Sequence, residues 1–248
     1  MAFASRFIMA LCGRVAAVAA GFALGTVELA IAQDNTVIEL FTSQGSSYCP
    51  RADRWLAGIA RNPGVVAVSF PVDYWDYIGW RDTLASPAFT ARQKAYAAVI
   101  ANSRLYTPQV IVDGLTAAAG GDEAEIEQAI DQAQSLDGAM TVPMRLTKSD
   151  GHYLVEIGEG SNGPASVVAL RVARATTVEI RRGENAGKSL TYTNVVRAIN
   201  KLGDWTGAAA TFNLPGTPQD GEGFVVLVQM GTPERPGAIL AAVKSDGL

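Results

Sequence analysis

The sequence predicts an α/β domain over residues 33–138, followed by an antiparallel β-sandwich over residues 139–248. Two observations predict this fold class. In the first part, apolar runs of strand length alternate with segments whose apolar residues recur at the helical period. After Asp137-Gly138 the pattern changes to short alternating runs separated by Gly, Asn and Pro, which is typical of antiparallel sheets.

The first part opens with a strand–helix–strand unit. Val37–Phe41 is an apolar run that only Glu39 interrupts, and Pro50–Arg61 carries the apolar spacing of a helix. Asn62-Pro63-Gly64 is a strong helix stop, and Val65–Phe70 is the continuous apolar run expected of a buried parallel strand. We therefore expect a βαβ unit with a right-handed crossover.

A second helix, a hairpin and a third helix complete the first part. Pro87–Ser103 has a helical pattern, and Thr107–Asp113 is a strand. Asp113-Gly114 is a turn signal before a returning strand at Leu115–Ala119, and Glu123–Ser135 has one apolar helical face. The predicted order of elements is therefore β-α-β-α-β-β-α.

The second part predicts strands that share a short alternating pattern and lie between turn residues. They are Val142–Leu146, Tyr153–Ile157, Ser166–Ala175, Leu190–Ile199, Ala210–Leu214, Gly223–Met230 and Ile239–Val243.

Residues 1–32 have the parts of a secretory signal peptide. Arg6 and Arg14 give a basic start, Val15–Leu24 is an apolar run, and Ala30–Ala32 is a small-residue cleavage pattern. We therefore expect an exported protein, periplasmic or secreted after cleavage near Ala32. An uncleaved N-terminal anchor is the alternative. No later stretch is apolar enough to predict a membrane span.

Charge and cysteine content argue against a nucleic-acid partner and against an internal disulfide. Removing residues 1–32 leaves 18 basic and 23 acidic residues, a net charge of −5, with no basic stripe, so the sequence predicts no nucleic-acid partner. Cys12 leaves with the signal peptide, so Cys49 is the one mature cysteine and cannot form an internal disulfide. It must be buried, capped or paired with another molecule.

Four stretches resemble a known family: Thr42–Asp53, Val72–Asp82, Tyr106–Gly114 and Arg182–Gly187. They are similar to the secreted thioredoxin-like proteins of domain-of-unknown-function family 1223. The resemblance implies a thioredoxin-like fold for residues 33–138 and a cis Thr107–Pro108 bond facing the loop that carries Cys49. The family usually has Cys-x-x-Cys in this loop, and here Ser46 stands in place of the first cysteine.

Cys49, Ser46 and Pro108 are the candidate catalytic residues. If the helix starts at Pro50, Cys49 is its N-cap and meets free amides that lower the pKa of the thiol. If the helix starts nearer Ser46, Cys49 turns inward, as the second cysteine of a thioredoxin motif does. Ser46 cannot replace a nucleophilic cysteine without a base. A buried inert thiol is the structural alternative.

An aromatic and acidic stretch after the second strand supplies the candidate binding residues. They are Asp73, Tyr74, Trp75, Asp76 and Trp80, together with Thr107. They lie where open α/β sheets bind ligands, and we expect them to line a cleft shared with the Ser46–Cys49 loop. Packing of the stretch onto the domain is the alternative. Arg181–Gly187 could bind an anion or a partner, although charged hairpins are usually solvated turns.

Two functions remain open, and the sequence leaves undecided whether the protein is an enzyme. One is a protein of the thiol-disulfide oxidoreductase type with a degenerate Ser-x-x-Cys motif. It would form mixed disulfides at Cys49 with a partner protein that carries a thiol or a disulfide, or take up oxidants there. The other is a non-catalytic module that grips a peptide or small ligand. The sequence predicts no cofactor and no metal site, because His152 and one cysteine cannot supply the usual zinc ligands.

Overall fold

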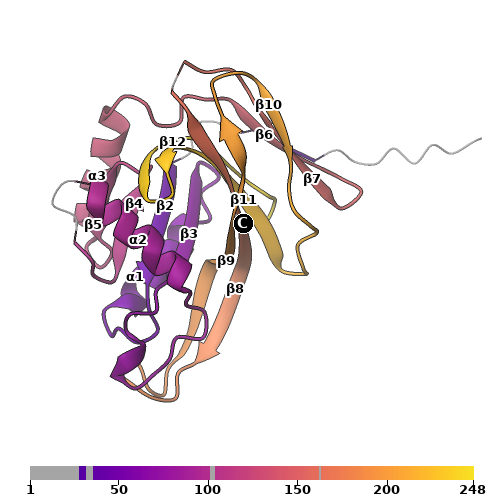
Figure 1. Ribbon diagram of the computed structural model, residues 1–248. Coiled ribbons are helices and arrows are strands. Elements are labelled where there is room, and N and C mark those ends of the chain that lie inside the picture. Colours follow the sequence, from indigo (N-terminus) through magenta and orange to yellow (C-terminus); the bar gives the residue numbers. More distant parts are fainter. Residues whose placement is uncertain (1–27, 32–35, 101–103, 162) are drawn as a thin grey trace, which may run out of the picture.

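The computed structural model describes residues 28–31, 36–100, 104–161 and 163–248 (Figure 1). The predicted signal peptide therefore lies outside the described residues, apart from the short strand β1 (Glu28–Ile31). No helix within the described ranges is long and apolar enough to cross a membrane. The chain is a mixed α/β structure with one large sheet and one small sheet.

The predicted elements of residues 36–135 are present in the predicted order. They are β2 (Thr36–Thr42), α1 (Cys49–Ile59), β3 (Val65–Pro71), α2 (Pro87–Val99), β4 (Gln109–Val112), β5 (Thr116–Ala119) and α3 (Glu123–Ser135). Strand β2 pairs in parallel with β3 and antiparallel with β4, and β4 pairs antiparallel with β5. Pro at the first turn of α2 and the Asp122 cap of α3, whose carboxylate accepts from two amides, fix the starts of these helices.

Four long strands extend the same sheet. They are β8 (Ala165–Glu179), β9 (Ser189–Trp205), β11 (Glu222–Thr232) and β12 (Arg235–Lys244). The full order is β12-β11-β8-β9-β3-β2-β4-β5, so one eight-stranded sheet contains strands from both predicted ranges, 33–138 and 139–248. Strands β8 and β9 are 15 and 17 residues long, well beyond the predicted Ser166–Ala175 and Leu190–Ile199.

The junction between β3 and β9 combines one backbone pair with side-chain hydrogen bonds. Ser69 and Val195 are paired in parallel. The Ser69 hydroxyl donates to the Thr193 carbonyl oxygen at 2.9 Å, and Asn194 Nδ2 donates to the Ala67 carbonyl oxygen at 2.9 Å. Asn194 has φ of 49°, a left-handed conformation that asparagine tolerates better than most residues. These side chains complete the pairing where the backbone ladder is short.

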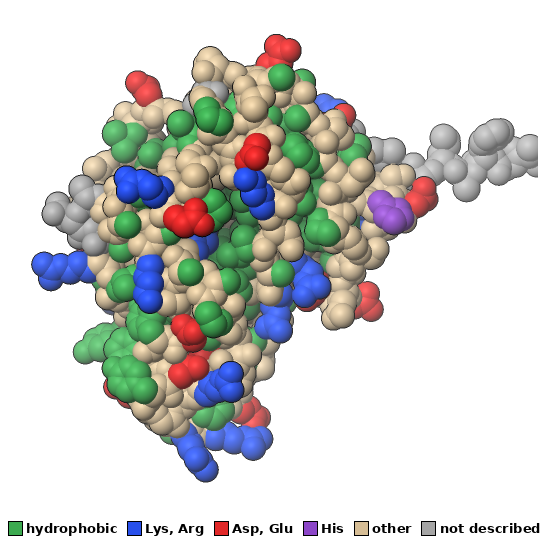
Figure 2. All heavy atoms as spheres, in the orientation of Figure 1, with side chains coloured by type: hydrophobic (Ala, Val, Ile, Leu, Met, Phe, Trp, Pro, Cys, Tyr) green, Lys and Arg blue, Asp and Glu red, His purple; other side chains and the backbone are tan. Residues whose placement is uncertain are grey.

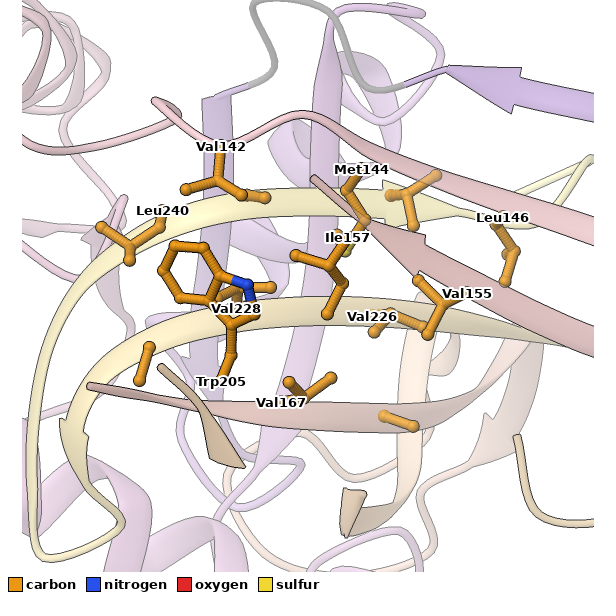
Figure 3. Close-up of a cluster of buried hydrophobic side chains, with 14 of the residues drawn as sticks. Val142, Met144, Leu146, Val155, Ile157, Val167, Trp205, Val226, Val228 and Leu240 are labelled. Carbon is orange, nitrogen blue, oxygen red and sulfur yellow. The ribbon is translucent and has the colours of Figure 1, made fainter. Parts of the chain in front are cut away.

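The small sheet covers one face of the long strands. It has the order β1-β6-β7-β10, with β6 (Met144–Ser149), β7 (His152–Ile157) and β10 (Ala210–Asn213). Its inner side chains pack with those of the long strands around the fully buried Trp205 (Figure 3). The labelled members are Val142, Met144, Leu146, Val155, Ile157, Val167, Trp205, Val226, Val228 and Leu240.

The helices cover the other part of the large sheet, on both faces. Ala52 and Leu56 of α1 pack with Ile126 of α3 on one face. On the other face, Phe89 and Tyr96 of α2 pack against the strands. The two faces meet different layers because successive side chains of a strand alternate. The loop that joins the end of β2 to the start of α1 lies at one end of the molecule (Figure 1).

Candidate functional site

The loop Thr42–Cys49, called here the sulfur loop, leads from β2 into α1. Cys49 is the first residue of α1, and Tyr48 before it already has helical backbone angles, with φ of −81° and ψ of −21°. Cys49 N–H donates to the Ser46 carbonyl oxygen at 3.2 Å. The structure therefore has the predicted alternative in which the helical turn begins near Ser46 and the sulfur points inward. Ser46 and Cys49 both have no exposed surface.

Burial controls the chemistry of the Cys49 thiol. Loss of hydration raises its pKa to about 11, and the nearby Asp53 carboxylate acts in the same direction. The hydroxyls of Thr42 and Thr107 and the amide of Ser43, which lies 3.4 Å from the sulfur, favour the thiolate but do not offset burial. At pH 7 the thiolate is therefore a minor form.

A second ionisable group, Asp53, lies one helical turn after Cys49. The Thr42 hydroxyl donates to its Oδ1 at 2.7 Å, and its buried Oδ2 has no hydrogen-bond partner among the described residues. Burial raises the pKa of Asp53 to about 7, and the Asp82 carboxylate acts in the same direction. Asp53, Asp82 and Cys49 in turn raise the pKa of Tyr192, which burial raises most. The sulfur loop thus covers a buried group of titratable side chains. Sequence analysis missed Asp53 because a carboxylate in the first turns of a helix is ordinary.

The predicted binding segment, Asp73–Asp82, packs onto the sulfur loop and contains the short helix η1 (Asp76–Ile78). Trp80 Nε1 donates to Gln44 Oε1 at 2.8 Å, and Gln44 N–H donates to Asp82 Oδ2 at 2.8 Å. Gly45 leaves little room, because an added Cβ would lie 3.1 Å from the Trp75 Cβ. The segment therefore covers the sulfur loop, as the packing alternative expected.

The acidic members of this segment are held by the protein itself. Thr90 Oγ1 donates to Asp73 Oδ1 at 2.6 Å, and Asp82 N–H donates to Asp76 Oδ1 at 3.0 Å. Tyr74 Oη is buried and has no hydrogen-bond partner among the described residues. Asp73 and Asp76 thus serve local structure.

A third segment reaches the sulfur loop from the far end of the chain. The turn Ile180–Lys188 between β8 and β9, called here the hairpin tip, closes over it. Asn185 Nδ2 donates to the carbonyl oxygens of Gln44 at 2.9 Å and Ser46 at 2.8 Å. Ser47 N–H donates to Glu184 Oε2 at 3.0 Å, although Glu184 is exposed. The stretch described from sequence as a usual solvated turn is therefore a structural cover, and Asn185 is fully buried.

The Thr107–Pro108 bond is cis, as the family resemblance implied. Thr107 lies beside the sulfur, because its hydroxyl lowers the pKa of Cys49. Pro108 is buried against Gly120, where an added Cβ would lie 2.9 Å from the proline Cβ. The structure thus brings the predicted catalytic residues to one place.

His152 is exposed at the β6–β7 turn of the small sheet. Within the described ranges, no group of three or more His, Cys, Asp or Glu side chains is arranged to hold a metal ion.

Comparisons with known proteins cover all three segments of this site. A family model described as "Protein of unknown function (DUF1223)" matches residues 37–229. The X-ray crystal structure of a protein from Agrobacterium tumefaciens, a structural genomics target, is 32% identical and has a TM-score of 0.75. That match covers 88% of this chain and 97% of the other. No curated protein sequence gives a match.

Proposed function

The chain belongs to the DUF1223 family, and on this premise we propose that it is an exported, thioredoxin-like binding protein that holds an acidic peptide over a closed sulfur loop without disulfide turnover. One observation carries the proposal. Ser46 and Cys49 have no exposed surface, while Tyr48 beside the thiol is 77% exposed. In the sulfur loop, the Tyr48 ring is therefore accessible to a partner, whereas the Cys49 sulfur is not.

The strand order supports the thioredoxin-like part of the proposal. In the order β3-β2-β4-β5, the first two strands along the chain are parallel neighbours joined through α1. The following hairpin adds to the other side of β2 in the antiparallel sense. This is the βαβ and ββα arrangement expected of a thioredoxin-like unit.

Stoichiometry and burial argue against turnover. A disulfide attacked by Cys49 would stop at the mixed disulfide, because a second thiol must release the substrate. Attack also needs thiolate and access, and Cys49 has a pKa of about 11 and no exposed surface.

The proposed binding surface surrounds the sulfur loop and is called here the tyrosine–arginine rim. Its members are exposed side chains on the sulfur loop, helix α1, the segment Asp73–Asp82 and the hairpin tip: Tyr48, Arg51, Tyr77, Arg81 and Arg182. Figure 2 shows Lys and Arg side chains projecting from the lower end of the molecule, with hydrophobic side chains beside them at the lower left. Exposed tyrosines give contact area at low entropic cost, and arginine forms bidentate pairs with carboxylates.

The arginines of the rim remain available to a partner. The side chain of Arg81 is 90% exposed, and its ion pair with Asp76 is long, at 3.9 Å from Nε to Oδ2. Arg51 Nη2 lies 3.5 Å from Glu123 Oε1, and both of these side chains are exposed. Exposed pairs of this kind contribute little, so a partner carboxylate can replace them. Sequence analysis found no basic stripe because these arginines are far apart along the chain.

A second candidate function, mixed-disulfide formation at Cys49, is favoured by Asp53. When the cover opens, hydration removes the main cause of the raised pKa of the Cys49 thiol, and the neighbouring Asp53 carboxylate can accept the thiol proton. The thiolate would then attack a partner disulfide, form one new S–S bond and release the partner's other sulfur as a thiolate.

Binding of two matched peptides tests the proposal. Each has about twelve residues, enough for an extended chain of roughly 40 Å, with Glu-Tyr repeats in one and Lys-Tyr repeats in the other. We expect the protein to bind the acidic peptide, with affinity falling as salt is raised. Arg81→Gln combined with Arg182→Gln weakens binding, while Lys94→Gln, exposed on α2, does not.

Cys49→Ser separates the two candidate functions. Peptide binding without turnover predicts that Cys49→Ser binds as the natural chain does. Binding that needs Cys49 and is reversed by dithiothreitol would replace the first proposal with the second. Equal binding of both peptides would reject the acidic partner.

A further inference from the structure

Strand β1 (Glu28–Ile31) closes one edge of the small sheet. Its residues pair antiparallel with those of β6 in the register Glu28↔Lys148, Leu29↔Thr147, Ala30↔Leu146 and Ile31↔Arg145. On its other side β6 pairs with β7, so β1 makes β6 an inner strand of the order β1-β6-β7-β10. The cleavage that the sequence predicts near Ala32 would remove β1 from the exported chain.

The backbone of β6 directs alternate residues to its two neighbours. The Pro143 carbonyl oxygen accepts from the Gly158 amide at 2.8 Å, on the side of β7. Because the backbone groups of successive residues point to opposite sides of a strand, Leu146 and Lys148 direct their N–H and C=O groups to β1. These two residues therefore depend on β1 for their ladder hydrogen bonds.

Strand β12 covers the part of the same edge that precedes β1. The Val142 amide donates to the Leu240 carbonyl oxygen of β12 at 3.0 Å. Leu146, further along β6, is 3% exposed and belongs to the core around Trp205. Without β1, open backbone groups beside this core would form the kind of exposed strand edge on which polypeptides associate. The fold therefore favours a mature chain that keeps β1.

A second small-residue pattern lies before β1 in the sequence. Ala23-Leu24-Gly25 stands at the end of the apolar run Val15–Leu24, with small residues at both positions of an A-x-A-like cleavage site. The pattern Ala30–Ala32 lies further from the run, beyond Glu28. Cleavage after Gly25 satisfies the same sequence rule and leaves β1 in the mature chain.

We propose that export cleaves the chain after Gly25, so that the mature protein begins at Thr26 and keeps β1 as the edge strand of the small sheet. The reaction is hydrolysis of one peptide bond by a signal peptidase. Water supplies the hydroxyl of the new Gly25 carboxyl group and the hydrogen of the new Thr26 amino group. The proposal rests on the proposed export and is independent of peptide binding at the sulfur loop.

Processing of the natural chain in an exporting bacterium tests the cleavage position. We expect N-terminal sequencing and intact mass to give an exported product that begins at Thr26. Gly25→Leu removes a small residue that this cleavage needs and should abolish it, whereas Ala32→Leu, the matched control, should still give Thr26. An exported product that begins at Gln33 would overturn the proposal and leave export standing. An uncleaved chain in the cytoplasm would overturn both.

Hydrogen exchange of the exported natural protein tests whether β1 is paired. The Leu146 and Lys148 amides should be protected, and Ala30→Pro should make them exchange about tenfold faster or more, because it removes a donor directed to β6. Leu29→Pro is the matched control, since its missing amide points away from β6. In the natural protein, exchange of both amides as fast as in an exposed loop would show an open edge and overturn the proposal.

Discussion

Asn185 and Ser46 are 139 positions apart in the sequence, yet Asn185 Nδ2 donates a 2.8 Å hydrogen bond to the Ser46 carbonyl oxygen. The same nitrogen donates to the Gln44 carbonyl oxygen at 2.9 Å. The cover of Cys49 therefore depends on a side chain from the far half of the large sheet.

Asn185→Ala should expose the thiol. The change leaves two carbonyl oxygens without their donor and costs about 1–3 kcal/mol. Since 1.4 kcal/mol is roughly tenfold in an equilibrium, an aromatic disulfide reagent should modify Cys49 about tenfold faster or more under native conditions. Arg181→Ala, an exposed change in the same tip, is the control. An unaltered rate in Asn185→Ala would show that the tip does not limit access.

Asp53→Asn should flatten the pH dependence of stability. The pKa of Asp53 is raised from 3.8 to about 7 by folding, so the folded state binds the proton more tightly than the unfolded state. The contribution of Asp53 to stability is therefore fully present below about pH 4, falls as pH rises towards 7, and levels off above that. In Asp53→Asn the fall should shrink by an amount on the order of a few kcal/mol. The amide oxygen can still accept from Thr42.

Urea unfolding at several pH values measures this effect. Asp82, with a pKa raised to about 6 by burial, contributes a smaller fall between about pH 4 and 6 in both proteins. The variant should also lower the pKa of Cys49, because the Asp53 carboxylate raises it. A natural chain that gains stability between pH 4 and 7 while the variant does not would contradict the assignment.

Ser46→Cys should give an internal disulfide with Cys49. Ser46 Oγ is buried with no hydrogen-bond partner among the described residues, so a sulfur there breaks no bond in that part of the chain. The natural chain should be inactive in insulin reduction, and Ser46→Cys should gain activity that rises further when Asn185→Ala is added. Ser46→Cys with Cys49→Ser is the control, since one thiol cannot complete the cycle. Failure to form the disulfide under oxidising conditions would reject the thioredoxin-like proposal for this loop.

Glu39 and Arg92 should be far more costly to change singly than together. Glu39→Leu leaves a buried guanidinium unpaired, and Arg92→Met leaves a buried carboxylate, each costing about 3–5 kcal/mol. The double variant should recover much of this loss, because it leaves no buried charge unpaired, the apolar side chains can pack on the rings of Phe70 and Tyr96, and the Tyr96 hydroxyl keeps its hydrogen bond from Gln229 Nε2. Denaturant midpoints of the four proteins give the coupling energy. Additive losses would show that the two side chains do not act as a pair.

Local sequence patterns predicted the elements of residues 36–135 because the spacing of apolar residues and the residues that mark helix and strand ends agree there. Pro87 and Asp122 mark true helix starts, and the apolar run Val65–Phe70 is a buried strand. Glu39 stood out in its apolar run, but its partner Arg92 comes from another element, and only the tertiary fold reveals the pairing.

The site was harder to predict because its cover is non-local. The ends of β8 and β9 near Thr177 and Thr191 are exposed polar strands, so they lack the apolar alternation by which strands are recognised. Asn185 lies in a turn among glycine and charged residues, where asparagine is common for local reasons. Nothing in that pattern distinguishes a side chain that binds a loop encoded far upstream.

The pairing of Ser69 with Val195 also limits when the large sheet can be completed. Strand β3 emerges early, but its neighbour β9 follows only after β4 to β8 have been made. Until then the nascent chain carries an apolar strand edge with no companion, the kind of edge on which polypeptides associate wrongly. Completion of the sheet joins strands far apart in the sequence, which slows folding, and a fragment that ends before β9 should be prone to aggregate.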